Sequence, residues 1–181
     1  MEYRRLGRWG VKLSELGFGS WLTLDDGDQE RGDRLFQTAY ENGINFFDTS
    51  NAYGRGGTEM VVGRSLTPFR RDTYVLGTKA FWPFDRNWPF RGANDRGLSR
   101  KHLFEQCHAS LRRLNTDYID LYQCHRFDPE TPLDETCGIM HDLINQGKVL
   151  YWGVSEWTAD QIRDACDICT ARGWHLPASN Q

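Results

Sequence analysis

Strand-like and helix-like segments alternate along most of this chain, and that alternation constrains its fold more than any other feature. Short apolar runs predict strands at 16–19, 44–47, 73–76, 118–122 and 149–154. Helical periodicity and capping residues predict helices at 31–41, 59–66, 99–114, 136–143 and 158–173. A helix between two strands can form the crossover that a parallel pair requires. The pattern therefore predicts a parallel sheet covered by helices.

A doubly wound sheet and a (β/α)8 barrel are the two architectures that fit this alternation. A dinucleotide-binding doubly wound sheet should open its first helix with G-x-G-x-x-G, and Gly17 and Gly19 supply only a G-x-G. We therefore predict an α/β fold of the (β/α)8, or TIM-barrel, class. An N-terminal β-hairpin over 3–13 should precede about six βα units, the last being a strand at 177–181 without its helix. Leu16 and Phe18, on the first barrel strand, are expected to face the interior.

The chain is shorter than this architecture requires. A complete barrel typically has about 250 residues, whereas this sequence has 181. No Pro- or Ser-rich linker and no shift in composition marks a second domain. We therefore expect one domain over residues 1–181 that lacks the C-terminal part of the barrel, with the first and last strands left as open edges.

Charge and cysteine content exclude several classes of protein. Lys and Arg total 22 and Asp and Glu total 25, so the formal net charge of −3 argues against nucleic acid as a partner. No apolar run approaches the roughly 18 residues that a membrane span needs, so no membrane insertion is expected. The first ten residues lack the apolar core of a secretory signal. Five cysteines at uneven spacing form a poor disulfide framework, which indicates a cytoplasmic protein.

Four polar side chains follow successive predicted strands at the points where those strands end. They are Asp48, Tyr53, Lys79 and His125. In a parallel barrel the carboxyl ends of the strands meet at one rim, so the four should converge there. Taken singly, each has a plainer interpretation, because an Asp after a strand often caps a turn and a Lys there is often solvated. Together they resemble a site that polarises a carbonyl group and delivers a proton.

The expected electrostatics of this site follow from adjacent strands. Lys79 and Asp48 should form an ion pair, and an ammonium near the Tyr53 phenol should lower the pKa of that hydroxyl. Tyr53 would then donate a proton near neutral pH, while His125 would donate a hydrogen bond to a substrate oxygen. The sequence offers neither a nucleophile–base pair nor a metal-ligand cluster, so no metal is expected.

The segment from Asp48 to Gly54, Asp-Thr-Ser-Asn-Ala-Tyr-Gly, resembles the Asp-Thr-Ala-x-x-Tyr-Gly signature of the aldo-keto reductases. Thr78-Lys79 and the run ending at His125 match the family's other two active-site positions. Further segments resemble the subgroup of voltage-gated potassium channel β subunits and their bacterial relatives. These are Gly19-Ser20-Trp21, Gly97 to His102, Ile144 to Lys148 and Tyr151 to Ser155.

The resemblance implies a barrel closed at its base by an N-terminal hairpin, and an oxidoreductase that uses NADPH to reduce aldehydes or ketones. It implies that Tyr53 is the general acid, that Lys79 and Asp48 tune it, and that His125 orients the carbonyl. The implied cofactor-binding positions are Ser20, Trp21, Asp48, Ser155 and Gln181. The resemblance does not carry a cofactor contact over to Glu156, where relatives usually have Asn or Arg. The family's seventh and eighth strands, which carry basic residues for the cofactor phosphates, are missing.

Three functional hypotheses stay open on the sequence. The first is a reductase acting on a small carbonyl substrate, and His125 favours it because the mammalian channel subunits carry Asn at the matching position. The second is a cofactor-sensing regulatory subunit that resembles the channel β subunits. The third is an inactive truncated chain. A homo-oligomer is compatible with each of them.

An aromatic loop follows the third predicted barrel strand. It runs from Phe81 to Phe90 and contains five aromatic residues and two prolines. Exposed aromatic clusters usually have a partner, so we expect this loop to form a substrate-facing wall or a subunit contact.

Overall fold

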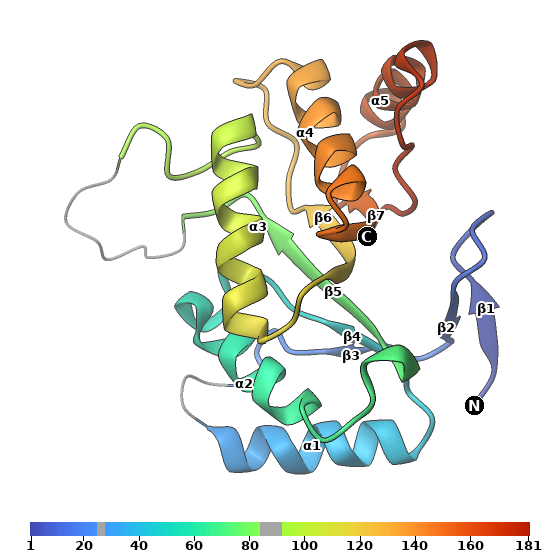
Figure 1. Cartoon of the computed structure of the whole chain (residues 1–181), viewed down its shortest axis with the longest axis vertical. Coiled ribbons are helices and arrows are strands. Elements are labelled where there is room, and N and C mark those ends of the chain that lie inside the picture. The colour runs from blue at the N-terminus through green and yellow to red at the C-terminus, as the bar shows by residue number, and fades with distance from the viewer. Residues whose placement is uncertain (25–27, 84–91) are drawn as a thin grey trace.

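Five parallel strands form the central sheet of the computed structural model, which describes residues 1–24, 28–83 and 92–181 (Figure 1). The strands are β3 (Phe18–Gly19), β4 (Phe46–Asp48), β5 (Val75–Ala80), β6 (Ile119–Cys124) and β7 (Val149–Val154). Each strand pairs with the one before it in the sequence, so the order in the sheet is the order in the chain. This is the arrangement of one part of a (β/α)8 barrel.

Each strand of the sheet is followed by a helix. The helices are α1 (Gln29–Glu41), α2 (Gly57–Leu66), α3 (Arg100–Leu114), α4 (Leu133–Asn145) and α5 (Ala159–Arg172). Short 3-10 turns cover Tyr53–Gly56 and Arg71–Thr73. Helices that follow one another in the chain pack against one another, from α1 through α5. No helix in the described ranges combines the length and the apolar character needed to cross a bilayer.

The predicted helix boundaries are confirmed where capping residues set them. The Ser99 side chain accepts a hydrogen bond from the His102 amide and begins α3. Thr158 and Gln161 form a reciprocal capping box at the start of α5, and Gly173 ends that helix in the left-handed conformation. These contacts satisfy backbone groups that a helix end otherwise leaves unpaired.

The hydrophobic core lies between the strands and their helices. Phe47 of β4 and Phe36 of α1 are buried, with ring centroids 5.1 Å apart. Phe18 packs against Phe36 at 4.8 Å, so it faces the helix layer, and the expectation that it faces the barrel interior is wrong. Leu16 precedes β3 and is 63% exposed. A strand of two residues makes its facing direction sensitive to a one-residue shift in register.

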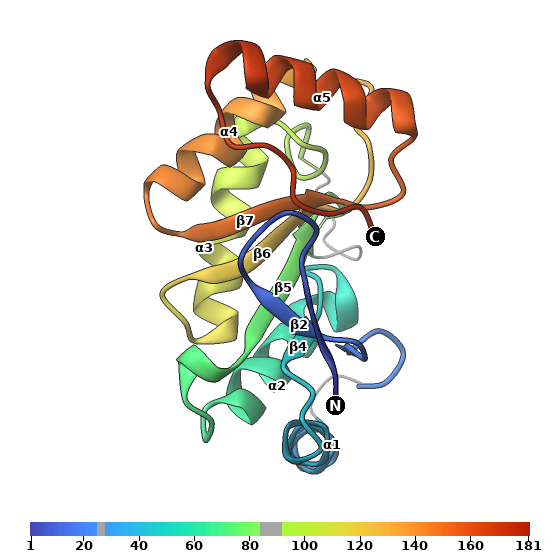
Figure 2. The same cartoon turned by 90° about the vertical axis from the view of Figure 1, so that its right-hand side faces the viewer.

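The predicted N-terminal hairpin is present. It lies beside the starting ends of β3, β4 and β5 in Figure 1, and in front of the sheet in the turned view of Figure 2. Its strands are β1 (Tyr3–Arg5) and β2 (Lys12–Ser14), which pair antiparallel. The Asn45 side chain, just before β4, accepts from the Ser14 amide at 2.7 Å. At the hairpin tip, Trp9 packs on Tyr151 of β7, with ring centroids 5.8 Å apart.

The expected sixth strand is present only as a single parallel bridge between Val154 and Asn180. The Ala178 amide donates to the Trp152 carbonyl at 2.7 Å, and the Gln181 amide donates to the Val154 carbonyl at 3.0 Å. The sequence predicts about six βα units, whereas the structure has five strand–helix units followed by a C-terminal segment that lies beside β7. Too few consecutive residues pair for a strand. Within the described ranges, β3 and this segment lie at opposite sheet edges and no backbone ladder joins them.

Gly63 of α2 lies against the end of α3, where a hydrogen atom is all that fits. A Cβ at position 63 would lie 2.5 Å from the Leu114 carbonyl oxygen, and the neighbouring atoms are also backbone. Because backbone cannot rotate aside as a side chain can, a larger residue must push the two helices apart. This close approach allows α2 to pack directly against the end of α3.

We expect Gly63→Ala to lower the free energy of unfolding by about 2 kcal/mol, because overpacking outweighs the helix propensity that alanine adds. Urea unfolding followed by circular dichroism measures the change. Gly10→Ala is the matched control, since a Cβ there meets nothing within 4 Å. That control should change stability by less than about 0.5 kcal/mol. Equal stability of Gly63→Ala and the unsubstituted chain would contradict the close approach.

Candidate active site

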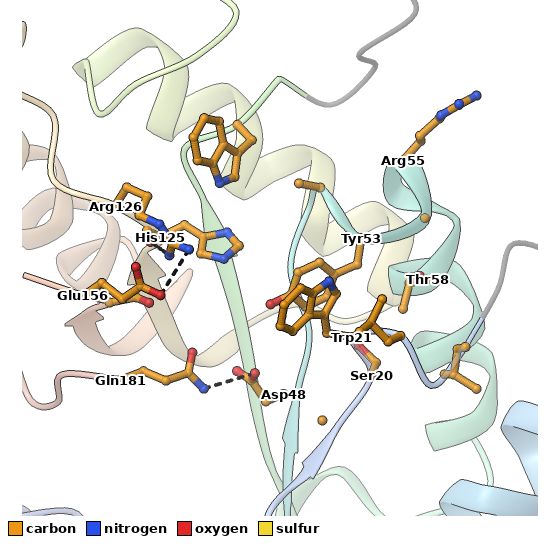
Figure 3. Close-up of a pocket in the computed structure, with 17 residues that line it drawn as sticks. Ser20, Trp21, Asp48, Tyr53, Arg55, Thr58, His125, Arg126, Glu156 and Gln181 are labelled. Atoms are coloured by element: carbon orange, nitrogen blue, oxygen red, sulfur yellow. Dashed lines mark hydrogen bonds and ion pairs between the residues drawn. The ribbon is translucent and has the colours of Figure 1, made fainter.

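A cavity of about 1010 Å³ opens at the carboxyl ends of the strands (Figure 3). Its wall contains most of the residues predicted from the sequence, drawn from the loops after β3, β4, β6 and β7 and from the C-terminal segment. These are Ser20, Trp21, Asp48, Tyr53, His125, Ser155 and Gln181. Lys79 lies just beneath the wall and is 1% exposed. The rule that functional side chains gather at the carboxyl ends of barrel strands thus locates the cavity.

The buried ion pair of Lys79 and Asp48 forms the floor of this cavity. The Lys79 Nζ lies 2.5 Å from Asp48 Oδ2 and donates a second hydrogen bond to the Thr49 carbonyl at 2.8 Å. Asp48 also accepts from the Gln181 amide at 3.3 Å and from Gln123 at 3.4 Å. Burial lowers the pKa of Lys79, and the Asp48 carboxylate opposes that shift. The predicted ion pair is confirmed.

Tyr53 lies in the 3-10 turn after β4 and is packed between the other predicted residues. The Lys79 Nζ is 5.2 Å from the centroid of its ring. Trp21 stacks on that ring with centroids 6.2 Å apart, and the His125 ring meets it edge-on at 5.8 Å. The structure therefore brings Asp48, Tyr53, Lys79 and His125 together.

The expected direction of the Tyr53 pKa shift is wrong. Burial raises the pKa of the Tyr53 hydroxyl from 10.0 to about 12, Asp48 raises it too, and Arg126 partly opposes them. Burial is the main reason, and the Asp48 carboxylate, which lies 2.5 Å from the Lys79 ammonium, adds to it. The phenol consequently keeps its proton at neutral pH.

His125 follows β6 and is buried at the cavity wall. Its Nδ1 lies 3.1 Å from the Ser50 hydroxyl, and its amide donates to the Ala80 carbonyl at 3.0 Å. Burial first, and then the charges of Lys79 and Arg126, lower the pKa of His125 to about 3. The imidazole is therefore neutral at physiological pH. With Nδ1 engaged by Ser50, Nε2 is the nitrogen available to a ligand.

The predicted cofactor-binding residues fit an amide-bearing ring. Ser20 is buried beside the cavity, and its hydroxyl has no hydrogen-bond partner within the described ranges. Ser155 and Gln181 line the same cavity and offer hydroxyl and amide groups. A nicotinamide carboxamide needs donors and acceptors of this kind. Trp21 is 66% exposed and offers an aromatic face over Tyr53.

Sequence reasoning missed an ion pair in the cavity wall. The Arg126 Nη2 lies 3.2 Å from Glu156 Oε1, and both residues line the cavity. Each directly follows a residue that was predicted, His125 and Ser155, at the ends of β6 and β7. That adjacency at the ends of neighbouring strands is the signal that could have found the pair.

Only the start of the aromatic loop can be placed. Trp82 lines the cavity, and Phe81 packs edge-on against it with centroids 4.8 Å apart. This agrees with a wall of the cavity for that part of the loop. The expectation for the rest of the aromatic segment concerns positions 84–91, which lie outside the described residues.

The chain matches the family model for the Aldo/keto reductase family over residues 15–181. It belongs to the aldo/keto reductase family. The predicted family is thereby confirmed.

Two plant proteins are similar to this aldo/keto reductase chain. A probable voltage-gated potassium channel subunit beta from Arabidopsis thaliana is 42% identical over 168 residues, which cover 91% of this chain and 49% of that protein. A protein of the same description from Oryza sativa subsp. japonica is 40% identical over 171 residues, covering 93% and 50%. These relatives match the predicted subgroup. The chain spans about half the length of the curated relatives it matches.

A solved structure supports the fold. A crystal structure of a thermostable aldo-keto reductase in complex with the inhibitor epalrestat superposes with a TM-score of 0.84 and 32% sequence identity. The match covers 100% of this chain and 62% of that structure's chain. This aldo/keto reductase chain therefore corresponds to a part of the complete barrel.

Lys79→Met is expected to lower the free energy of unfolding by about 3 kcal/mol at pH 7, because it leaves the Asp48 carboxylate without its ammonium. The double variant Lys79→Met/Asp48→Asn should recover at least about half of that loss, since it leaves no unpaired charge. Urea unfolding of the single and double variants measures the coupling. Strictly additive effects of the two substitutions would contradict the ion pair.

Proposed function

We propose that the site reduces small aldehydes or ketones to alcohols with NADPH as the cofactor. The observation that carries this proposal is the convergence of a protonated phenol and a neutral imidazole above a buried ion pair. Tyr53 and His125 lie with ring centroids 5.8 Å apart on one cavity wall. That pair of donors suits a carbonyl oxygen on which negative charge develops.

The protonation states of Tyr53 and His125 support this chemistry. The substrate's carbonyl oxygen would accept hydrogen bonds from the Tyr53 hydroxyl and from Nε2–H of His125, with Nδ1 accepting from Ser50. As the oxygen becomes an alkoxide, Tyr53 transfers its proton to it and the product alcohol forms. NADPH, when bound, supplies the hydride that reduces the carbonyl carbon.

We propose that the Lys79 ammonium offsets part of the cost that burial and Asp48 impose on the charge that Tyr53 acquires. Once the proton has left, the phenolate lies next to the Lys79 ammonium, whose Nζ is 5.2 Å from the ring centroid. Asp48 holds that ammonium in place at 2.5 Å. A charge fixed in advance costs no reorganisation during the reaction, which is the basis of electrostatic catalysis.

Five residues would hold the nicotinamide end of the cofactor. They are Ser20, Trp21, Asp48, Ser155 and Gln181. The hydroxyl and amide groups would pair with the carboxamide, and the unpartnered Ser20 hydroxyl supports this assignment. The preference for NADPH over NADH rests on the resemblance to the family.

A cofactor-sensing regulatory subunit is the second candidate function. The 42% and 40% identity to probable potassium channel β subunits favours it. The two candidates differ in turnover, because a sensor should bind the cofactor and reduce a generic aldehyde barely or not at all. For either function we propose a cytoplasmic location, which the five free thiols support.

We expect Tyr53→Phe to reduce the turnover of 4-nitrobenzaldehyde at least about 100-fold, because the phenol supplies the only proton that moves to the substrate. Binding of NADPH, measured by calorimetry, should change little. Tyr40→Phe is the matched control, since that hydroxyl bonds Thr73 at the surface, away from the cavity.

The assay separates the candidates. Turnover that depends on Tyr53 supports the reductase, and NADPH binding without turnover in the unsubstituted chain supports the sensor. Retention of more than a tenth of the turnover in Tyr53→Phe would contradict the role of Tyr53.

A further inference from the structure

Arg126 lies in the cavity wall beside His125 and Glu156 (Figure 3). It directly follows His125, and its Nη1 donates to the His125 carbonyl at 2.5 Å. Its Nη2 meets Glu156 at 3.2 Å. A guanidinium carries five N–H donors, so these two contacts leave donors for a ligand.

Glu156, the ion-pair partner of Arg126, competes only weakly with an anionic ligand for the guanidinium. The side chains of Arg126 and Glu156 are 34% and 66% exposed, so water competes for both charges. Glu156 adopts a positive φ of 55°, a conformation that favours glycine, and its amide donates to the Gln181 carbonyl at 2.9 Å. The strained backbone at Glu156 holds its carboxylate against the Arg126 guanidinium, but the carboxylate stays exposed to solvent.

The other charges of the cavity floor are already balanced. Asp48 is paired with the buried Lys79 at 2.5 Å, whereas Arg126 lies directly beside His125, one of the proposed carbonyl-binding groups. Its positive charge lowers the pKa of both Tyr53 and His125, so its field extends over the place where a carbonyl would bind.

We propose that Arg126 forms a subsite for an anionic group of the substrate, and that the site accepts aldehydes or ketones that carry a carboxylate on a short spacer. This inference rests on the proposed reductase function. The substrate carboxylate displaces Glu156 from the guanidinium and accepts two parallel N–H hydrogen bonds from it. A substrate without a negative charge cannot displace Glu156, so the ion pair of Arg126 and Glu156 stays intact and the guanidinium does not bind that substrate.

A matched pair of substrates tests the subsite. The probes are 4-carboxybenzaldehyde and its uncharged ester, methyl 4-formylbenzoate, which differ at the far end of the ring from the aldehyde. The unsubstituted chain should give the higher kcat/KM with the acid. Arg126→Met should lower the acid-to-ester ratio of kcat/KM at least tenfold. Glu156→Gln should raise that ratio severalfold, because it removes the competing carboxylate.

A binding measurement keeps the test independent of turnover. Calorimetry with the product acid, 4-(hydroxymethyl)benzoate, and with its methyl ester should show the same loss of preference in Arg126→Met. Failure of both aldehydes to turn over, with the acid still preferred in binding, would contradict the reductase and leave the subsite supported. An unchanged acid-to-ester ratio in both variants would overturn the subsite. Loss of NADPH affinity in Arg126→Met with an unchanged ratio would also overturn it, since Arg126 would then be a cofactor contact.

Discussion

Lys79 carries its ammonium into a position that is 1% exposed, and Asp48 is the group that makes this burial tolerable. An ammonium taken out of water is strongly destabilising unless a carboxylate and further hydrogen bonds compensate it. The pair joins β4 to β5, and Asp48 also accepts from Gln123 of β6 and from Gln181 beside β7. A single carboxylate therefore connects four neighbouring segments at the carboxyl edge of the sheet.

The same pair determines the charge state of the groups around it. Burial dominates at Tyr53, the Asp48 carboxylate raises the pKa of its hydroxyl further, and the phenol stays protonated. His125 is kept uncharged by burial and by the nearby cations. Both groups are thus uncharged hydrogen-bond donors, as the proposed binding of a carbonyl oxygen requires. Arg126, half-buried and paired with Glu156 in the cavity wall, is the group that we propose distinguishes charged from uncharged substrates.

The sequence was sufficient to predict features that follow from the order of the strands and helices. Parallel strands end at one edge, so residues such as Asp48 and Lys79 could be predicted to meet without knowledge of their distances. The facing of Phe18 could not be predicted, because a two-residue strand leaves the register open. The pKa of Tyr53 depends on how closely Asp48 balances Lys79, which is a matter of ångströms. The contact of Arg126 with a neighbouring strand end depends on side-chain conformations that no local pattern encodes.

The ionisation of Tyr53 tests most directly whether the buried pair leaves this phenol protonated. The chemical shift of its ring carbon Cζ, followed by ¹³C NMR in chain labelled at tyrosine and assigned with Tyr53→Phe, reports the pKa of that hydroxyl alone. Burial beside a balanced pair predicts a pKa of about 12, above the ordinary value of 10.0. A pKa below about 9 would show that Lys79 acts as an uncompensated charge, and would contradict the account.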